Sequence, residues 1–158
     1  MSEIHFISLF KFLNHNIEYI EKIKDSYLLL LSELSLTNYL ETDLFIFNLE
    51  KINEHGEIII AYTGSFDNNN FEIIATGTII IESKIIREGK NVGHIEDIVV
   101  AKHFRSIGLS QTILNMLKEI AREKNCYKVI LDCSEEVKNV YIKNGFRVKG
   151  IQMAEYFV

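Results

Sequence analysis

The sequence feature that most constrains the fold lies in the second half of the chain, where two apolar runs flank a helical pattern. His94–Ala101 has the composition of a strand, and residues 111–124 place their apolar side chains on one helical face. Tyr127–Cys133 is nearly continuous in apolar residues, which is typical of a strand in the middle of a sheet. A strand, a helix and a second strand in this order predict an α/β domain.

Two further helices are predicted in the first half of the chain. Residues 16–35 carry a helical stripe of apolar residues, with Asn16 as the predicted cap. A shorter helix follows Thr42 and ends at Gly56, because glycine is a common C-terminal residue of helices.

The remaining segments are predicted to complete the sheet. Glu57–Gly64 and Phe71–Ile81 are rich in Ile, Thr, Tyr and Phe and enclose an Asp-Asn-Asn-Asn turn, which predicts an antiparallel hairpin. Ser83–Gly93 is a polar connection. Glu136–Asn144 predicts a short helix closed by a glycine, and Phe146–Val158 is predicted as a final strand region.

The length and composition predict one domain. The 158 residues are 47% hydrophobic and 25% charged, a normal globular balance, and the absence of proline, repeats and low-complexity tracts leaves no linker. Residues 1–158 are therefore expected to form a single mixed α/β domain. The net charge of −5 argues against general nucleic-acid binding, which needs an excess of Lys and Arg facing phosphates.

A cytoplasmic location is predicted from two features. No apolar run approaches the ~20 residues of a membrane span, and the start of the chain lacks the basic residues and cleavage site of a secretory signal. Cys126 and Cys133 have an odd spacing, which places them on opposite faces of a strand. They are therefore expected to be two buried free thiols in a reducing compartment, with no disulfide and no shared metal.

The turn before the 111–124 helix has the composition of an anion-binding site. It reads Arg105-x-x-Gly108-x-Ser110. The first turn of a helix offers free backbone N–H groups and the positive end of the helix dipole, which suit a pyrophosphate. Small side chains let the backbone approach the anion, and Arg105 adds a positive charge. A lone glycine between a strand and a helix is more often only a turn, so the flanking residues decide the interpretation.

The flanking residues form blocks that resemble one family. The blocks are Gly93-His94-Ile95-Glu96-Asp97-Ile98-Val99-Val100, Cys126–Cys133, Val140-Tyr141-x-Lys143-x-Gly145-Phe146 and Gln152-Met153-Ala154. Together with the turn, in one register over residues 80–155, they resemble the glucosamine 6-phosphate N-acetyltransferases of the GNAT superfamily. The first 75 residues match only in their order of elements.

The resemblance implies a fold and a reaction. The expected fold is that of a GNAT domain, with a mixed central sheet that is splayed at the acetyl-CoA site and flanked by helices. The expected reaction is direct transfer of the acetyl group of acetyl-CoA to the amine of glucosamine 6-phosphate, giving N-acetylglucosamine 6-phosphate and CoA. The resemblance also implies a homodimer and no metal.

The resemblance assigns the acetyl-CoA site to two segments and a tyrosine. The backbone of Ile98, Val99 and Val100 would lie along the pantetheine and polarise the thioester carbonyl. Tyr141 matches a tyrosine that faces the CoA sulfur, and a phenol with a pKa of about 10 is a suitable proton donor to the leaving thiolate. Without the resemblance, Tyr141 would be interpreted as a packing aromatic. The pyrophosphate would be held by Arg105, Ser106, Ile107, Gly108, Leu109, Ser110 and Gln111.

Carboxylates are predicted to line the acceptor site. Glu96 and Asp97 match an acidic pair, but neighbouring residues point to opposite faces of a regular strand. Both carboxylates can reach one ligand only if a bulge or kink interrupts the strand. The alternative is that one of them is merely exposed to solvent at the strand end. Asp132 follows an apolar strand, where α/β sheets present ligands, and would hydrogen-bond the amine and help accept its proton. The alternative for Asp132 is an acid at the N-terminus of the next helix. The predicted catalytic residues are thus Asp97, Asp132 and Tyr141.

Two cationic segments are predicted to bind the sugar phosphate. Lys84 and Arg87 lie in a loop that is otherwise short of partners, and two cations three residues apart suit a phosphate monoester. Tyr127 and Lys128 match a second phosphate- or sugar-binding pair, which the family supplies across a dimer interface. Ser32 matches, in a looser alignment, a threonine that touches the sugar. With the acidic pair Glu96 and Asp97, the predicted substrate-binding residues are Ser32, Lys84, Ile85, Ile86, Arg87, Tyr127 and Lys128.

Departures from the family pattern keep other functions open. Ser106, Ser110 and Gln111 replace two glycines and a lysine, and serine disfavours positive φ, so weaker acetyl-CoA binding or a shifted turn is expected. One alternative is a GNAT enzyme with another acceptor, such as an amino acid, a polyamine or a protein N-terminus. Another is a non-catalytic acyl-CoA-binding module. The cationic segments favour a phosphorylated acceptor, and the presence of Asp132 and Tyr141 favours catalysis.

Overall fold

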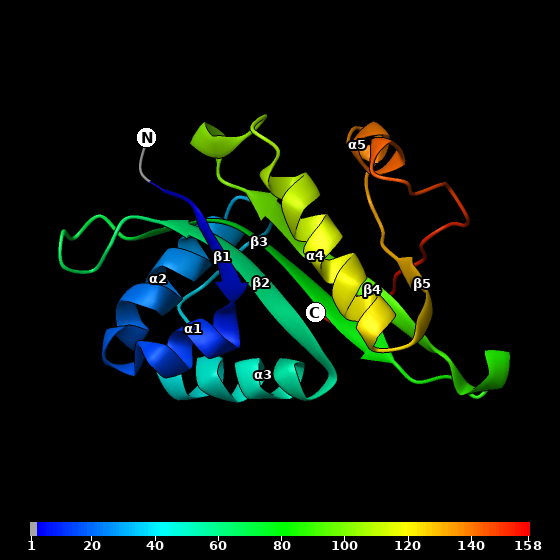
Figure 1. The fold of residues 1–158 in the computed structure, drawn as a ribbon, viewed down its shortest axis with the longest axis horizontal. Helices are drawn as coiled ribbons and strands as arrows, with labels where there is room; N and C mark the ends of the chain where they lie inside the picture. Colours follow the sequence, from blue (N-terminus) through cyan, green and yellow to red (C-terminus); the bar gives the residue numbers. More distant parts are fainter. Residues whose placement is uncertain (1–2) are drawn as a thin grey trace.

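A five-stranded mixed sheet forms the centre of the computed structural model, which describes residues 3–158 (Figure 1). The strands, in both chain order and spatial order, are β1 His5–Ser8, β2 Gly56–Thr63, β3 Glu72–Glu82, β4 Asn91–Val100 and β5 Cys126–Ile130. Neighbouring strands are antiparallel from β1 to β4, whereas β4 and β5 are parallel. The predicted mixed sheet is therefore confirmed.

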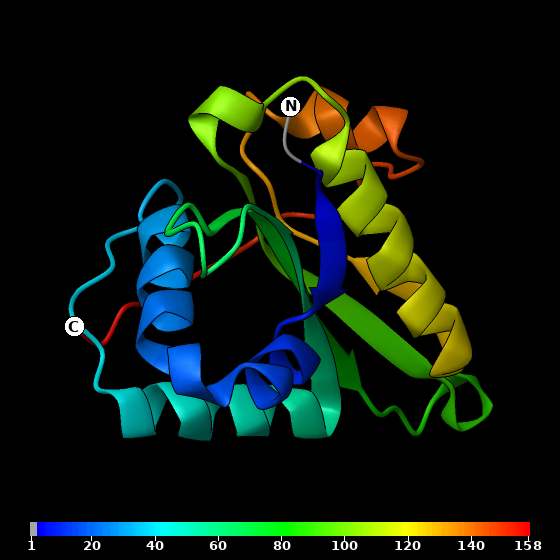
Figure 2. The ribbon, with the colours of Figure 1, turned by 60° about the vertical axis from the view of Figure 1, so that its left-hand side comes forward.

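Helices cover both faces of this sheet. They are α1 Leu9–His15, α2 Ile20–Leu31, α3 Thr42–His55, α4 Leu109–Glu123 and α5 Lys138–Lys143. The first three lie on one side of the sheet, and α4 crosses the other side (Figure 2). A parallel pair of strands needs a crossover connection, and α4 supplies it between β4 and β5.

The core consists mainly of isoleucine and leucine side chains between the sheet and its helices. Ile60 of β2 and Ile74 and Ile79 of β3 are fully buried, as are Ile23 of α2 and Leu114 of α4. β-Branched residues fit a pleated surface, and the two-residue period of a strand sends alternate side chains to opposite faces. Both faces of the central strands are therefore closed by helices.

Most of the predicted elements are confirmed. The helix expected to end at Gly56 is α3, and the hairpin after it is β2 and β3. Gly56 is extended, and a Cβ there would lie 1.9 Å from the Ile79 carbonyl oxygen, so close strand approach requires the glycine. The helices predicted at residues 111–124 and 136–144 are α4 and α5, and Gly145 closes α5 with a φ of 87°.

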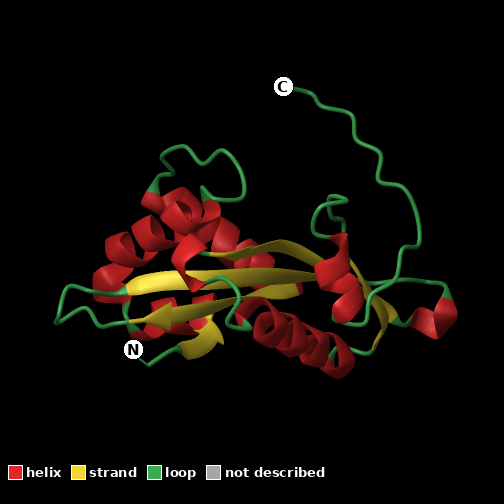
Figure 3. Cartoon of the chain, turned by 90° about the horizontal axis from the view of Figure 1, so that it is seen from above, coloured by secondary structure: helices red, strands yellow, loops and turns green. Residues whose placement is uncertain are grey.

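Two strand predictions are corrected by the structure. β5 lies at the edge of the sheet and ends at Ile130, whereas the sequence predicted a strand to Cys133 in the middle of a sheet. Phe146–Val158, predicted as a strand region, contains no strand and extends away from the sheet (Figure 3). A strand needs a neighbour for its backbone hydrogen bonds, and no segment among residues 3–158 pairs with this tail.

Two smaller predictions are also wrong. Asn16 does not cap the helix predicted over residues 16–35 with its side chain. Its side-chain amide instead donates to the Phe12 carbonyl oxygen at 2.8 Å, at the end of α1. The sequence prediction did not include α1. Cys126 is partly exposed and Cys133 is exposed, so the thiols are not buried. The reason is the position of β5 at the edge of the sheet, which leaves this segment open to solvent.

Candidate active site

A bulge interrupts β4 where the sequence predicts the acidic pair. Pairing with β3 runs through Glu96 and resumes at Val99, so Asp97 and Ile98 together face Gly77 alone. Asp97 has a φ of 53°, a left-handed conformation that aspartate tolerates better than most residues. The bulge that Glu96 and Asp97 need in order to reach one ligand is therefore confirmed.

Gly77 makes room for this bulge. A Cβ at Gly77 would lie 2.4 Å from Ile98 Cδ1 and 2.7 Å from Ile113 Cγ2 of α4. A larger residue would therefore force the bulged strand and α4 apart. A glycine inside a strand often marks a bulge or a close approach, so the sequence carried this signal, although the prediction omits Gly77.

Three carboxylates gather at the bulge. Partial burial raises the pKa of Glu96, and the charges of Asp97 and Asp132 raise it further, against an opposing effect of His94. Burial also raises the pKa of Asp97, although this residue as a whole is exposed. Asp132 accepts a hydrogen bond from Gln152 Nε2 at 3.0 Å. A raised pKa makes a carboxylate a stronger base, which suits proton transfer from an amine.

The alternative role of Asp132, an acid at a helix N-terminus, does not hold. The next helix, α5, begins at Lys138, after the intervening turn at Ser134–Val137. Asp132 instead lies on the segment that follows β5, close enough to Glu96 to raise its pKa.

β4 and β5 separate beside these carboxylates. Their parallel pairing ends at His94 and Ile130, while β4 continues to Val100. Within residues 3–158, the edge of β4 that faces β5 therefore has no strand partner beyond His94. This is the splay that the sequence predicts for the acetyl-CoA site. A free strand edge offers backbone N–H and C=O groups to an extended ligand chain.

The predicted pyrophosphate turn lies between β4 and α4. Gly108 is the N-cap of α4 with a φ of 88°, and a Cβ there would meet no atom within 4 Å, so the turn is open. Ser106 adopts a φ of 66° despite being a serine, whereas Ser110 lies inside α4 and needs no left-handed backbone. The first N–H groups of α4 and its dipole favour an anion at this place.

Arg105, the first residue of the turn, is bound to other protein groups. Its Nη2 donates to Glu33 Oε2 at 3.0 Å, and its Nε donates to the Val100 carbonyl oxygen at 3.0 Å. The other carboxylate oxygen of Glu33 accepts from the Lys102 N–H at 3.3 Å. The sequence prediction lacks Glu33, because no local pattern connects two residues that are 72 positions apart.

The two predicted cationic segments meet within one chain. The guanidinium carbon of Arg87 lies 5.6 Å from the centre of the Tyr127 ring, and Lys128 Nζ lies 5.5 Å from it. Both contacts are cation–π interactions on a partly exposed tyrosine. The structure therefore brings Arg87, Tyr127 and Lys128 together and leaves both cations at the surface.

Lys84 was predicted to lie in a loop short of partners, but its ammonium group already has one. Glu82 accepts a hydrogen bond from Lys84 and lies 2.7 Å from Nε2 of His94. The hydrogen bonds from Lys84 and His94 hold the pKa of Glu82 below its usual value. Glu82 is thus a further residue that the sequence prediction omits. Ile85 and Ile86 are 97% and 62% exposed, so their side chains line no pocket in the described chain.

Tyr141 lies near Cys133 and Phe146, whereas the hydroxyl of Ser32 has a partner in its own helix. The Tyr141 ring packs edge-on against Phe146 at 6.0 Å between centres. Burial raises the pKa of Tyr141, and the thiol of Cys133, next to Asp132 in the chain, adds to the effect. Ser32 ends α2, is exposed, and donates its hydroxyl to a carbonyl oxygen of its own helix at 2.6 Å.

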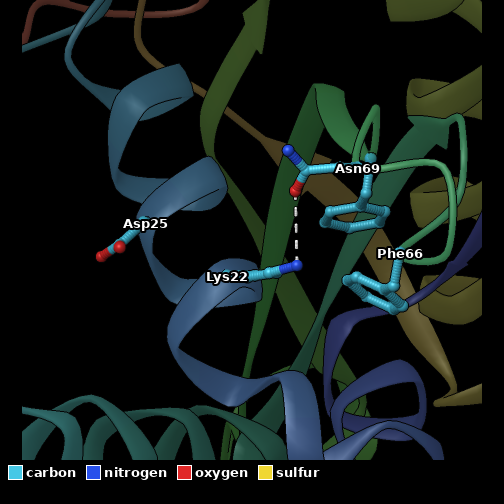
Figure 4. Close-up of a pocket in the computed structure, with 5 residues that line it drawn as sticks. Lys22, Asp25, Phe66 and Asn69 are labelled. Atoms are coloured by element: carbon cyan, nitrogen blue, oxygen red, sulfur yellow. Dashed lines mark hydrogen bonds between the residues drawn. The ribbon is translucent and has the colours of Figure 1, made fainter.

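A hollow of about 240 Å³ lies between α2 and the turn that joins β2 to β3 (Figure 4). Lys22 reaches across it to Asn69, with 3.4 Å between Nζ and Oδ1, whereas Asp25 points away. Phe66 and Phe71 form the rest of its lining. None of the predicted catalytic or acetyl-CoA-binding residues lines this hollow.

Residues 3–158 lack two features. No helix there is long and apolar enough to cross a membrane. These residues also hold no group of three or more His, Cys, Asp or Glu side chains placed to bind a metal ion.

The fold and the site define an acyltransferase of the GNAT type. A five-stranded mixed sheet, splayed between its fourth and fifth strands and flanked by helices, is the arrangement that the resemblance to that superfamily predicts. The model of the Acetyltransferase (GNAT) family matches residues 19–146, and the chain belongs to this family. Acetyltransferases of this family use acetyl-CoA as cosubstrate.

Within the family, the chain is similar to enzymes that act on an amino-sugar phosphate. It is 51% identical over 85 residues to the probable glucosamine 6-phosphate N-acetyltransferase 2 of Oryza sativa subsp. japonica. This matched segment covers 54% of this chain and 51% of that protein. It is 37% identical to the glucosamine 6-phosphate N-acetyltransferase of Arabidopsis thaliana over 81% of this chain and 85% of that protein. The crystal structure of the Arabidopsis thaliana enzyme superposes with a TM-score of 0.83 at 31% identity and covers 99% of both chains.

Proposed function

We propose that this chain transfers the acetyl group of acetyl-CoA directly to the amine of glucosamine 6-phosphate, giving N-acetylglucosamine 6-phosphate and CoA. The observation that carries the proposal is the gathering of Glu96, Asp97 and Asp132 at the bulge of β4, beside the splay of β4 and β5. Membership of the GNAT family supports the reaction, and the similarity to glucosamine 6-phosphate N-acetyltransferases supports the acceptor.

In this proposal acetyl-CoA binds along the free edge of β4. The backbone of Ile98–Val100 pairs with the pantetheine arm, and one of its N–H groups donates to the thioester oxygen as negative charge develops there. The turn Arg105–Gln111 holds the pyrophosphate at the N-terminus of α4. The open space around Gly108 supports this placement, because an anion can approach the backbone closely there.

The acidic residues and Tyr141 handle the protons. An amine attacks only with a free lone pair, so Asp97, helped by Asp132, accepts the proton of the ammonium group, and Glu96 binds the sugar. The nitrogen then forms a bond to the thioester carbon while the carbon–sulfur bond breaks. Tyr141 gives its proton to the departing CoA thiolate, and the second proton, which the nitrogen loses as it becomes an amide, restores the phenol through solvent. The raised pKa of Tyr141 keeps the phenol in the protonated form that this role requires.

The 6-phosphate is assigned to the cationic segments. Arg87, from the loop Lys84–Arg87, and Lys128 both lie over the partly exposed ring of Tyr127, and both cations are at the surface. A phosphate dianion binds well to such a pair, since guanidinium and ammonium groups both donate to its oxygens. Ser32 is assigned to the sugar.

We also propose that residues 1–158 form a single domain and that two such chains form a homodimer. The location proposed for the protein is the cytoplasm. The support for the homodimer is the C-terminal tail, in which Ile151, Met153, Tyr156 and Phe157 are 92%, 91%, 86% and 89% exposed. So many large apolar side chains in one exposed segment indicate an interaction site, and a second copy would bury them. Sedimentation at micromolar concentration should give a dimer; a mass near 18.3 kDa would contradict it.

One assay tests the reaction and its acceptor. Release of the free CoA thiol is followed with acetyl-CoA and, in turn, glucosamine 6-phosphate, glucosamine, amino acids, polyamines and a peptide with a free N-terminus. Glucosamine 6-phosphate should give the highest kcat/KM. Preference for another amine would make the chain a GNAT enzyme with a different acceptor. Binding of CoA without release from any acceptor would indicate a non-catalytic acyl-CoA-binding module.

A further inference from the structure

We propose that Glu33 is a positioning residue for acetyl-CoA binding. Its carboxylate holds Arg105 as a brace, so that Arg105 fixes the shape of the pyrophosphate turn and does not itself contact the pyrophosphate. The inference rests on the acetyl-CoA site proposed above and changes the role of one of its residues.

The contacts of Glu33 and Arg105 close both ends of a short segment. Glu33 accepts from the Lys102 N–H, where the 3-10 turn Lys102–Phe104 begins, and from the Arg105 side chain, just after the turn ends. Arg105 in turn donates to the carbonyl oxygen of Val100, the last residue of β4. One carboxylate and one guanidinium therefore join the end of α2, the end of β4 and the start of the pyrophosphate turn.

The backbone that follows this brace is one that needs support. Ser106 has a φ of 66°, and a serine adopts such a left-handed conformation only at a cost in free energy. A residue in an unfavourable conformation persists when its surroundings hold it there. Because Arg105 precedes Ser106 directly, fixing its side chain at two points restricts the backbone of the turn.

The same contacts make Arg105 a poor direct ligand for the pyrophosphate. Two of its donor groups, Nε and Nη2, are already engaged, and the Glu33 carboxylate offsets its charge. A guanidinium presents its donors in a fixed plane, so donors that serve Val100 and Glu33 cannot turn toward another anion. A lysine at this position would keep the charge but could not make both contacts.

Titration calorimetry with CoA tests the inference in the full chain, with Glu33→Gln, Arg105→Lys and the double variant. The brace predicts that each single substitution weakens CoA binding by about three- to tenfold. This loss lies between that expected for a solvent-screened surface ion pair and that expected for a hydrogen bond to a charged group. The double variant should bind no more weakly than either single variant, because both remove the same brace. At saturating acetyl-CoA, kcat of Glu33→Gln should stay within about twofold of the parent, since Glu33 touches no reacting atom.

A second ion pair provides the matched control. Glu119 and Arg122 form an exposed pair at the far end of α4. Glu119→Gln and Arg122→Lys should leave the CoA dissociation constant unchanged.

Two results would overturn the inference. If Arg105 contacts the pyrophosphate directly, Glu33→Gln frees its charge and tightens CoA binding, while Arg105→Lys keeps the charge and costs little. If the pair is only structural, both variants lower the melting temperature and leave the dissociation constant unchanged. A parent chain that binds no CoA would remove the proposed function together with the brace, whereas a parent that binds CoA and fails to acetylate glucosamine 6-phosphate would remove only the acceptor.

Discussion

The two halves of the sheet differ in how completely their strands are paired. β2 pairs with β3 along its whole length, whereas β4 and β5 pair only between Asn91–His94 and Cys126–Ile130 before they separate. The non-glycine residues with positive φ are also distributed unevenly between the two halves of the sheet. Apart from Asn69 in the hairpin turn, they are Arg87, Glu88, Asp97, Ser106 and Asn125. Of these, Asp97 and Ser106 lie beyond the end of the β4–β5 pairing, whereas Arg87, Glu88 and Asn125 lie in the connections just before β4 and β5. Unfavourable backbone conformations are thus concentrated around β4 and β5.

The largest effect is expected for Tyr141→Phe in the open half. The ring that packs against Phe146 remains, and only the proton donor is lost. General-acid assistance contributes about 10²–10⁴-fold, so the single-turnover rate of acetyl transfer should fall by that factor with acetyl-CoA binding unchanged. Tyr19→Phe, in the aromatic cluster around Phe66, is the matched control. A rate within about twofold of the parent would reduce Tyr141 to a packing residue.

In the paired half, Ile60→Ala should lower stability and leave the chemistry intact. Ile60 is fully buried, and truncating such a residue costs about 2–5 kcal/mol. Urea unfolding measures this loss, and the KM values of the protein that remains folded should match those of the parent. If KM for either substrate changes strongly while the variant is folded, the paired half also shapes the substrate sites, and the division between stability in one half and chemistry in the other fails.

Arg87→Ala should have a smaller and selective effect. A hydrogen bond to a charged group contributes about 1.5–3 kcal/mol, so kcat/KM for glucosamine 6-phosphate should fall about 10–150-fold. Glucosamine lacks the phosphate and should be affected little. Lys90→Ala, an exposed cation of the same loop, is the control. Equal losses for both substrates would mean that Arg87 supports the loop and does not read the phosphate.

The smallest effect concerns stability, and its sign is informative. Burial raises the pKa of Asp97 above its value in the unfolded chain, which is about 3.9. Below that pH the carboxyl is protonated in both states; as the pH rises through the raised value, ionisation is harder in the folded state and stability is lost. Asp97→Asn should therefore melt slightly above the parent near pH 7 and equally near pH 3. Asp67→Asn, in the exposed hairpin turn, should show no such pH-dependent gain. A lower melting temperature for Asp97→Asn at pH 7 would mean that the carboxylate stabilises the bulge.

Local patterns were sufficient to predict most of the fold. α3, α4 and the β2–β3 hairpin each depend on the residues of one segment, and their periodicity identified them. The alternation of a strand left two alternatives for Glu96 and Asp97, a bulge or one solvated carboxylate, and the structure shows the bulge. The cationic pair of Arg87 and Lys128 followed from the resemblance, and the structure brings both onto Tyr127.

Contacts between distant segments could not be predicted in this way. Glu33 and Arg105 lie 72 positions apart, and neither local pattern indicates the other. Lys84 was expected to lack partners, but its partner Glu82 is the last residue of β3 and lies outside the predicted Ser83–Gly93 connection. The C-terminal tail has the apolar composition of a strand, but composition does not supply the neighbouring strand that its backbone needs.

The most direct test of the central claim, that the β4 bulge performs the chemistry, is the single-turnover rate of acetyl transfer from acetyl-CoA to glucosamine 6-phosphate by Asp97→Asn. Asparagine tolerates the left-handed backbone of this position, so the bulge should persist. The account predicts a rate about 10²–10⁴-fold below that of the parent, with acetyl-CoA binding unchanged and a melting temperature at least as high. A rate within about twofold of the parent in this folded variant would contradict the account.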